Sequence, residues 1–475
     1  MKKEVDHVTK EILEKITPTE ADRAKMQALA KDLERRVSAA CAEFGVEAVV
    51  RLEGSVAKDT WLREEPDVDV FMRLPATIPR KDLGEISLKI ARKATEGSKQ
   101  IERFAEHPYL EAFVDGTRVN IVPCYAGKPG EWLSATDRTP FHTDYINKHL
   151  DQSLRGEVRL LKKFMKGINV YGAEIKVGGF SGYLCELLVL HYGSFTETLQ
   201  AFKHHSPRRV IDIEGYYEHR GRELQLLFPE TLVIIDPVDK GRNVASAVQA
   251  QRLHTFVGAS RAFLTAPQTE FFYPLKTAPL SVEELHIALK NRGSSLVFLT
   301  CSKIEAVPDV LWGQLYRTRK ALRKQLELSD FKVLRDAVWS ENNVAFTMFV
   351  FELEQRVIPL AKKHLGPPLE REKECESFLA KYVDSGDVIA GPYIDEGRWM
   401  VEMRRKFTDA SELLRTKLIS GGRDSGVAEL IAKALRQDFL ILTGEEVTEH
   451  YAYNQGFAEF LTDFLSGKPF WLEAT

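Results

Sequence analysis

The first 50 residues carry apolar side chains at helical spacing. The series consists of Ile12, Ile16, Met26, Leu29, Leu33 and Val37. This spacing predicts amphipathic helix, and Thr17-Pro18-Thr19 marks a break where a second helix begins. Apolar segments at 48–52 and 67–74 predict strands, and a helical pattern follows over 83–94.

Two further strands are predicted on either side of a tight turn. Residues 111–114 and 117–123 are joined by Asp115-Gly116, a dipeptide that strongly favours a β-hairpin. Together with the earlier strands, the hairpin predicts a small mixed sheet backed by helices.

Beyond residue 140 the pattern changes twice. It is mostly helical until about 265, with one apolar strand at 232–236. The later elements are a strand at 295–299, a helix at 311–326, strands at 331–338 and 344–351 over a turn at 340–343, and a tail strand at 398–403. The β-α-β-β order among them resembles a ferredoxin-like layout.

Length and charge limit the number of domains and the way in which the protein could bind RNA. A chain of 475 residues exceeds one typical core, so two to four domains are expected. Lys and Arg number 66 against 69 Asp and Glu, for a formal charge of −3. No global basic field is present, and any RNA binding must come from local patches.

The cysteines and the apolar runs predict a cytoplasmic protein. The five cysteines are scattered without a CxxC pair, which is typical of buried thiols in a reducing compartment. The charged opening of the chain is not that of a signal peptide, and no apolar run reaches membrane-spanning length.

A Gly-Ser turn followed by two aspartates is the most informative polar pattern. Gly54-Ser55 follows the first strand, and Asp67 and Asp69 are spaced i, i+2 in the next one. On a strand such side chains share a face, and adjacent carboxylates favour a cation between them. Mg²⁺ takes oxygen ligands of this kind together with substrate phosphates, which the turn and Lys58 could face. The alternative is an exposed Asp-x-Asp on an edge strand.

A third partner is expected on the neighbouring strand, because two-metal nucleotidyl transfer commonly uses another carboxylate there. The predicted hairpin offers Asn120, whose carbonyl oxygen is neutral and cannot take a proton. Asn120 could equally be an ordinary polar strand residue.

Polar residues farther along the chain admit two interpretations. Thr139 and His142 lie in a segment that could hold phosphates or could simply cap a helix. The structural alternatives for the others are a solvated Lys162, a helix end at Tyr171 and an ion pair of Arg242 with Asp239.

Taken in order, these segments resemble the archaeal (class I) CCA-adding tRNA nucleotidyltransferases. The resemblance covers residues 50–250 and rests on the motifs at 54–62, 67–71, 105–109, 122–125, 137–142, 158–162, 171–174, 180–188, 236–239 and 242–245. It implies template-independent addition of C, C and A to the 3′ end of tRNA from CTP and ATP, with Mg²⁺ as cofactor and a homodimer.

The resemblance also implies an α+β fold with four parts. These are a polymerase-β-like nucleotidyltransferase head with a mixed sheet (1–140), a helical neck for base recognition (141–265), a ferredoxin-like body that binds RNA (266–365) and an α/β tail for the tRNA elbow (366–475).

By position, the resemblance assigns metal binding and catalysis to Asp67 and Asp69, with Asn120 where the family has aspartate. Base reading falls to Arg242. Contacts with the rest of the nucleotide fall to Gly54, Ser55, Lys58 (usually Arg in the family), Thr139, His142, Lys162 and Tyr171. Two alternatives stay open: a tRNA-binding homologue whose catalysis is impaired by Asn120, and a poly(A)-polymerase-like transferase with another acceptor.

Overall fold

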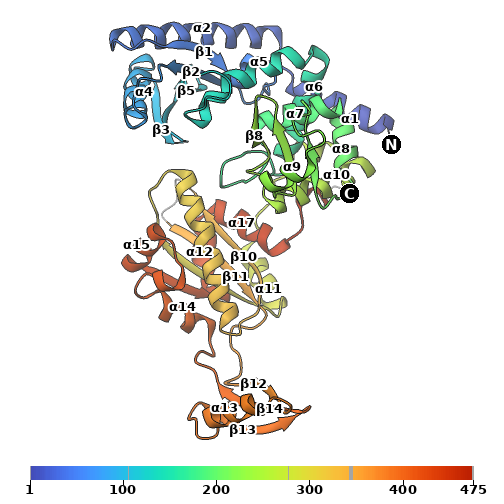
Figure 1. Ribbon diagram of the computed structural model, residues 1–475, viewed down its shortest axis with the longest axis vertical. Coiled ribbons are helices and arrows are strands. Elements are labelled where there is room, and N and C mark those ends of the chain that lie inside the picture. The colour runs from blue at the N-terminus through green and yellow to red at the C-terminus, as the bar shows by residue number, and fades with distance from the viewer. Residues whose placement is uncertain (1, 105, 277, 342–345, 473–475) are drawn as a thin grey trace. The chain divides into compact units, whose positions relative to one another are not determined.

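The computed structural model describes residues 2–104, 106–276, 278–341 and 346–472, which form two compact units (Figure 1). The first unit comprises residues 1–275 together with 469–475, and the second comprises 276–468. The chain thus leaves the first unit, builds the second and returns.

A five-stranded sheet organises the beginning of the first unit. Its strands are β1 (Val49–Glu53), β2 (Asp67–Leu74), β3 (Lys99–Phe104), β4 (Pro108–Val114) and β5 (Thr117–Tyr125), in the spatial order β1-β2-β5-β4-β3. The pair β2–β5 is parallel and the others are antiparallel, so the sheet is mixed, as the sequence predicted. The edge strand β3 was not predicted, because Lys99–Phe104 lacks a clear apolar alternation.

One face of this sheet is covered by α2 (Glu20–Glu43) and α4 (Arg80–Ala94). Thr19 caps α2 and forms a capping box with Asp22, which explains the break predicted at residues 17–19. The core beneath the helices includes Val68 and Val70, both fully buried. The alternate residues of β2 therefore point to the opposite face, which α5 (Thr139–His149) covers only in part through contacts with β1.

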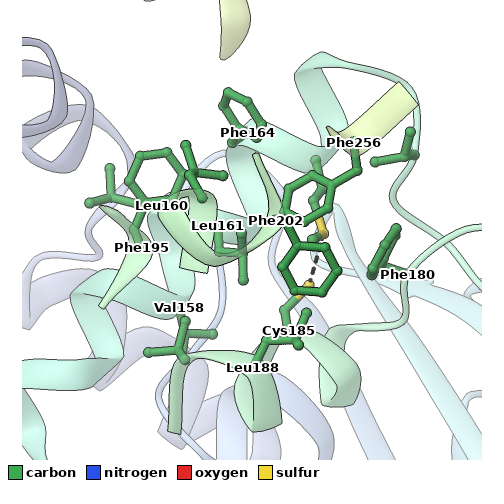
Figure 2. Close-up of a cluster of buried hydrophobic side chains, with 14 of the residues drawn as sticks. Val158, Leu160, Leu161, Phe164, Phe180, Cys185, Leu188, Phe195, Phe202 and Phe256 are labelled. Atoms are coloured by element: carbon green, nitrogen blue, oxygen red, sulfur yellow. Dashed lines mark hydrogen bonds between the residues drawn. The ribbon is translucent and has the colours of Figure 1, made fainter. Parts of the chain in front are cut away.

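The remainder of the first unit is mainly helical. Its elements are α1 (Lys2–Ile16), α3 (Gly54–Ala57), α6 (Gln152–Gly167), α7 (Gly182–Tyr192), α8 (Phe195–Phe202), α9 (Gly221–Leu227), α10 (Ala250–Thr265) and a small sheet of β6 (Arg209–Ile211), β7 (Leu232–Asp236) and β8 (Asp239–Asn243). Figure 2 shows part of the core that α6, α7, α8 and α10 share, in which Phe164 of α6 packs near Phe195 and Phe256. In this arrangement α6 and α7 lie side by side.

The second unit is built on a four-stranded antiparallel sheet. Its strands are β9 (Ser295–Ser302), β10 (Val333–Ser340), β11 (Phe346–Leu353) and β15 (Phe439–Thr443), in the order β10-β11-β9-β15. Both faces are buried, because α12 (Pro308–Leu328), α14 (Ala410–Leu418) and α15 (Glu429–Gln437) contribute to one core and α11 (Val282–Asn291), α16 (Thr448–Tyr453) and α17 (Gln455–Ser466) to the other. The predicted turn at 340–343 lies partly outside the described residues.

A smaller sheet is inserted between β11 and β15. It comprises β12 (Ala361–Pro368), β13 (Val388–Asp395) and β14 (Arg398–Arg404), with α13 (Glu372–Tyr382) against it. Since β15 pairs with β9, the ferredoxin-like sheet includes residues that lie after the predicted body–tail boundary at 365/366. The β-α-β-β order alone could not reveal this fourth strand, which pairs across the insertion.

Candidate active site in the first unit

Gly54 brings the backbone against one of the two aspartates. It has φ +72°, and a Cβ at this position would lie 2.1 Å from Oδ2 of Asp69. Glycine is therefore required both by the left-handed backbone and by the space that the carboxylate occupies. The pairing of β1 with β2 sets this approach, because Glu53 lies directly opposite Asp69.

The neighbouring strand contributes two polar side chains to the same face. Asn120 is the register partner of Asp69, and its Nδ2 donates to Asp69 Oδ1 at 2.9 Å. Arg118 is the partner of Asp67 and donates two hydrogen bonds to that carboxylate, the one from Nε at 2.6 Å. The amide nitrogen of Asn120, and not its oxygen, thus faces the aspartate pair.

Burial raises the pKa of Asp69 to about 6, although the hydrogen bond from Asn120 opposes the shift. Such a carboxylate is favoured in its charged form by any cation that approaches it. The donor set suits a divalent metal, because Asp67 and Asp69 present hard oxygen ligands on one face and phosphate or water could complete the shell. Among the described residues no cluster of three or more His, Cys, Asp or Glu side chains has metal-binding geometry.

A buried cluster of charges lies beside this face. Lys58 Nζ is 2.6 Å from Glu186 Oε2, and Lys162 Nζ is 3.0 Å from Glu186 Oε1. Thr60 donates to Glu186 Oε1 at 2.6 Å and accepts from Lys162 at 2.9 Å. Glu186 is fully buried and Lys162 is only 3% exposed, so the solvated-lysine alternative is wrong.

The charges in this cluster stabilise one another. Burial opposes ionisation of Glu186, but Lys162 and Lys58 outweigh it and lower the pKa to about 2. Burial lowers the pKa of Lys162, and the Glu186 carboxylate opposes that shift. The three charged groups therefore form one buried network between α6, α7 and the segment that follows β1.

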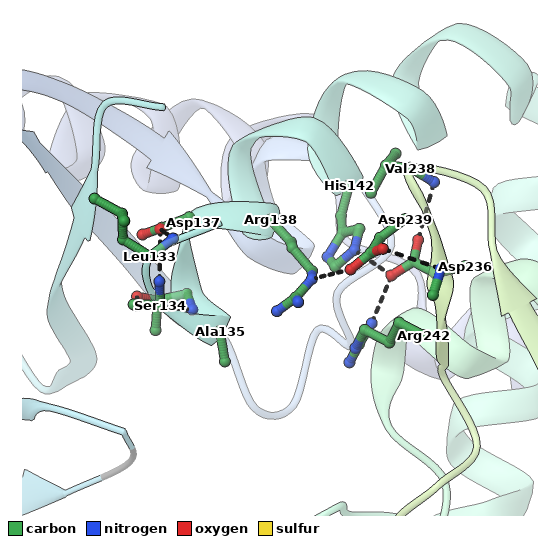
Figure 3. A network of polar contacts seen from close by, with 12 residues as sticks. Leu133, Ser134, Ala135, Asp137, Arg138, His142, Asp236, Val238, Asp239 and Arg242 are labelled. Carbon is green, nitrogen blue, oxygen red and sulfur yellow. Dashed lines mark hydrogen bonds and ion pairs between the residues drawn. The ribbon is translucent and has the colours of Figure 1, made fainter. Parts of the chain in front are cut away.

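A second buried carboxylate gathers residues from three elements (Figure 3). Asp236 Oδ2 lies 2.9 Å from His142 Nε2 and 2.7 Å from an Arg242 guanidinium nitrogen. Its Oδ1 accepts from the Tyr183 hydroxyl at 3.1 Å, and the Tyr183 ring stacks on His142 with centroids 4.0 Å apart. Burial raises the pKa of Asp236, but His142 and Arg242 outweigh it and bring the pKa to about 2.

The structure corrects the alternative that Arg242 pairs with Asp239. Its ion-pair partner is Asp236, whereas Asp239 pairs with Arg138 at 2.7 Å. Burial also lowers the pKa of His142, against the effect of Asp236. Arg242 keeps more than a third of its side chain exposed, which leaves donors available to a ligand.

The other predicted residues lie on or next to the elements that hold the two clusters. Ser55 lies in α3, directly after Gly54, and Thr139 is the first residue of α5. The Tyr171 hydroxyl lies 2.9 Å from where a Cβ of Gly182 would stand, at the start of α7. That same position is 3.5 Å from Lys162 Nζ, which places Tyr171 beside the charge cluster.

Glu186, Asp236 and Glu53 were not predicted as site residues. A signal existed for Glu186, which is a charged residue within the apolar run of α7. Asp236 ends a fully buried strand, which is also unusual for a carboxylate. The distant partners of these residues, however, cannot be read from local spacing.

Three family models match the chain in succession. Residues 33–142 match a nucleotidyltransferase domain, residues 156–273 match the second domain of tRNA nucleotidyltransferases, and residues 292–444 match the C-terminal domain of CCA-adding enzymes. A CCA-adding enzyme of Methanosarcina barkeri is 39% identical over 86% of this chain and 88% of its own length. One of Haloarcula marismortui is 34% identical over 99% of this chain and 100% of its own.

The chain belongs to the CCA-adding enzyme family.

The nucleotidyltransferase domain of this CCA-adding family member contains the five-stranded sheet with Gly54, Asp67 and Asp69, and its match ends at His142. The second-domain match contains Lys162, Glu186 and Asp236. Among solved structures, a cytoplasmic RNA terminal U-transferase aligns over 59% of this chain and 100% of that one, with 15% identity and a TM-score of 0.44. An alignment with so low a TM-score supports no conclusion about the function of this chain. In the described residues, no helix is both long and apolar enough to span a membrane.

Proposed function

We propose that this protein adds C, C and A to the 3′ end of tRNA from CTP and ATP, without a nucleic-acid template and with release of pyrophosphate. The observation that carries the proposal is the aspartate pair of β2 beside two buried lysines, in a chain that matches CCA-adding enzymes along nearly its whole length.

Asp67 and Asp69 would hold the divalent metal, which we propose to be Mg²⁺. Bound there, Mg²⁺ would lower the pKa of the attacking ribose hydroxyl and neutralise charge on the phosphates. Arg118 holds Asp67 and Asn120 holds Asp69 in the present geometry, so both carboxylates are oriented before any ligand binds. A metal contact through the side-chain oxygen of Asn120 stays a prediction. It requires the amide group to turn over, because the nitrogen now faces Asp69.

The nucleotide would lie between the two buried carboxylate clusters. Gly54 and Ser55 offer backbone N–H groups and a hydroxyl at the turn, and Lys58 offers an ammonium group next to Asp69. Further contacts to the triphosphate or sugar are proposed for Thr139, His142, Lys162 and Tyr171. Arg242, fixed on one side by Asp236, would present its remaining donors to the incoming base.

The partners and location follow from the same proposal. We propose that residues 276–468 bind the acceptor stem and elbow of tRNA, through phosphate and shape contacts, and that the protein acts as a cytoplasmic homodimer. The five cysteines support a reducing compartment, since all are free and buried. The division into head, neck, body and tail at 140, 265 and 365 stays a prediction.

One assay tests the activity. The protein is incubated with tRNA that lacks its CCA end, together with Mg²⁺, CTP and ATP, and an Asn120→Asp variant is run in parallel. Extension by three nucleotides from both proteins supports the proposal. Extension by the variant alone would mean that the chain is an impaired homologue, and long A tracts from ATP alone would indicate a poly(A)-polymerase-like enzyme. No extension by either would exclude the activity.

A further inference from the structure

The two buried lysines beside the aspartates differ in how fully they are bonded. Lys162 Nζ donates to Glu186 Oε1, to Thr60 Oγ1 and, at 3.2 Å, to the Thr60 carbonyl oxygen. An ammonium group has three N–H donors, so Lys162 has none left. Lys58 Nζ has one hydrogen-bond acceptor within the described residues, which is Glu186 Oε2 at 2.6 Å.

Lys58 is also held on a second side. Its ammonium lies 5.7 Å from the centre of the Tyr183 ring, and its positive charge lowers the pKa of Asp69. Within the described residues Glu186 takes one of the three N–H donors of Lys58, which leaves two for a ligand. Lys58 is 6% exposed, so protein surrounds most of its side chain.

We propose that Glu186 is a positioning residue for the triphosphate of the nucleotide. It holds the Lys58 ammonium group in place for contact with the triphosphate, and it stabilises the charged form of Lys162 beside it. The inference rests on the proposed function, because it takes Lys58 as a triphosphate contact.

The net charge of the cluster agrees with this role. Two ammonium groups and one carboxylate leave a single positive charge on the cluster, which favours a phosphate group nearby. Replacing Glu186 by a neutral group would leave two buried cations without their carboxylate partner, which disfavours their charged forms. Glu186 therefore keeps both lysines charged and fixes where one of them points.

The test measures binding of CTP with Mg²⁺, and of inorganic pyrophosphate, to the full chain by calorimetry, and separates KM from kcat in the extension assay. Glu186→Gln should weaken both ligands about tenfold and raise KM for CTP and ATP equally, with a much smaller change in kcat. Glu186→Asp keeps the charge with a shorter reach, and should restore part of the affinity.

A double-mutant cycle with Lys58→Met tests whether Glu186 acts through Lys58. If Glu186 acts through Lys58, then Lys58→Met should weaken CTP binding strongly in the original chain, less in a Glu186→Asp background and only slightly in a Glu186→Gln background. Glu352→Gln is the matched control, because Glu352 is also buried with a pKa near 2 but lies in the second unit. It should lower the melting temperature without changing CTP affinity.

Unchanged CTP affinity in Glu186→Gln, or additive effects with Lys58→Met, would overturn the inference. Should Glu186→Gln not fold, the cycle with Glu186→Asp decides in the same way. If the original chain binds CTP but does not extend tRNA, the proposed function fails while the role of Glu186 is still decided by binding. If it binds neither CTP nor pyrophosphate, both fail together.

Discussion

Asn120 donates its amide hydrogen to Asp69 from the adjacent parallel strand, at 2.9 Å. The donor stabilises a carboxylate whose pKa burial raises to about 6, in a place where a metal-binding site often has a further acid. Asn120 therefore offsets part of the electrostatic cost of burying this carboxylate.

Asn120→Asp should make the stability of the protein depend on a divalent cation. The substitution replaces a donor by a like charge next to Asp69, so the melting temperature should fall by about 5 °C in EDTA. Addition of Mg²⁺ should recover most of that loss in the variant and change the original chain little. Thermal unfolding with and without Mg²⁺ measures this, and an equal response of both proteins would contradict it.

Gly54→Ala should abolish most activity while the fold survives. The new methyl group would stand 2.1 Å from Asp69 Oδ2 and would displace that carboxylate. Misplacement of a reacting group by about 1 Å costs on the order of 100-fold in rate, so a loss of at least that size is expected in the extension assay. Gly45→Ala is the matched control: Gly45 has φ +67° but open space around it, and this variant should keep its activity.

Glu53→Gln should stabilise the protein at high pH. Glu53 is fully buried, neither carboxylate oxygen accepts a well-aligned hydrogen bond, and burial raises its pKa from 4.5 to about 7. Because the folded-state pKa is the higher one, the stability from protonated Glu53 is complete below about pH 4.5 and is lost as the pH rises through 7.

The free energy of unfolding should therefore respond to this substitution in a pH-dependent way. Near pH 8 the variant should gain up to about 3 kcal/mol over the original chain, and the gain should vanish toward pH 4.5. Urea unfolding at a series of pH values measures the difference. A difference that does not vary with pH would show that Glu53 does not titrate in this range.

Asp236→Asn should reduce discrimination among nucleotides. It removes the charge that holds both His142 and Arg242, and Arg242 can then turn toward solvent. The preference for CTP and ATP over UTP and GTP should fall by about tenfold, as measured from initial rates with each nucleotide. Asp239→Asn, which frees Arg138 instead, should leave the preference unchanged.

Local pattern was sufficient to predict that Asp67 and Asp69 share a face. Both lie on β2, and Gly54 directly follows β1, so alternation along β2 and the turn before it predict which side chains meet. The helices around residues 157–165 and 182–192 could likewise be predicted, because their apolar faces are strongly periodic.

The charge clusters could not be predicted in this way. Glu186 meets Lys58 across 128 positions and Asp236 meets His142 across 94, and the pattern of either segment gives no information about the other. The alternative considered for Arg242, an ion pair with Asp239, named the wrong aspartate, because it relied on proximity in sequence. Tertiary packing of α5, α7 and β7 decides these partners.

The return of the chain to the first unit has a consequence for the order of synthesis. Trp471 is buried there and stacks on Phe271 at 6.0 Å, although residues 276–468 form the other unit. A growing polypeptide emerges from the ribosome N-terminus first, so the first unit receives this core side chain only after the second unit has been synthesised. A chain interrupted anywhere in the second unit would be released with that core still open.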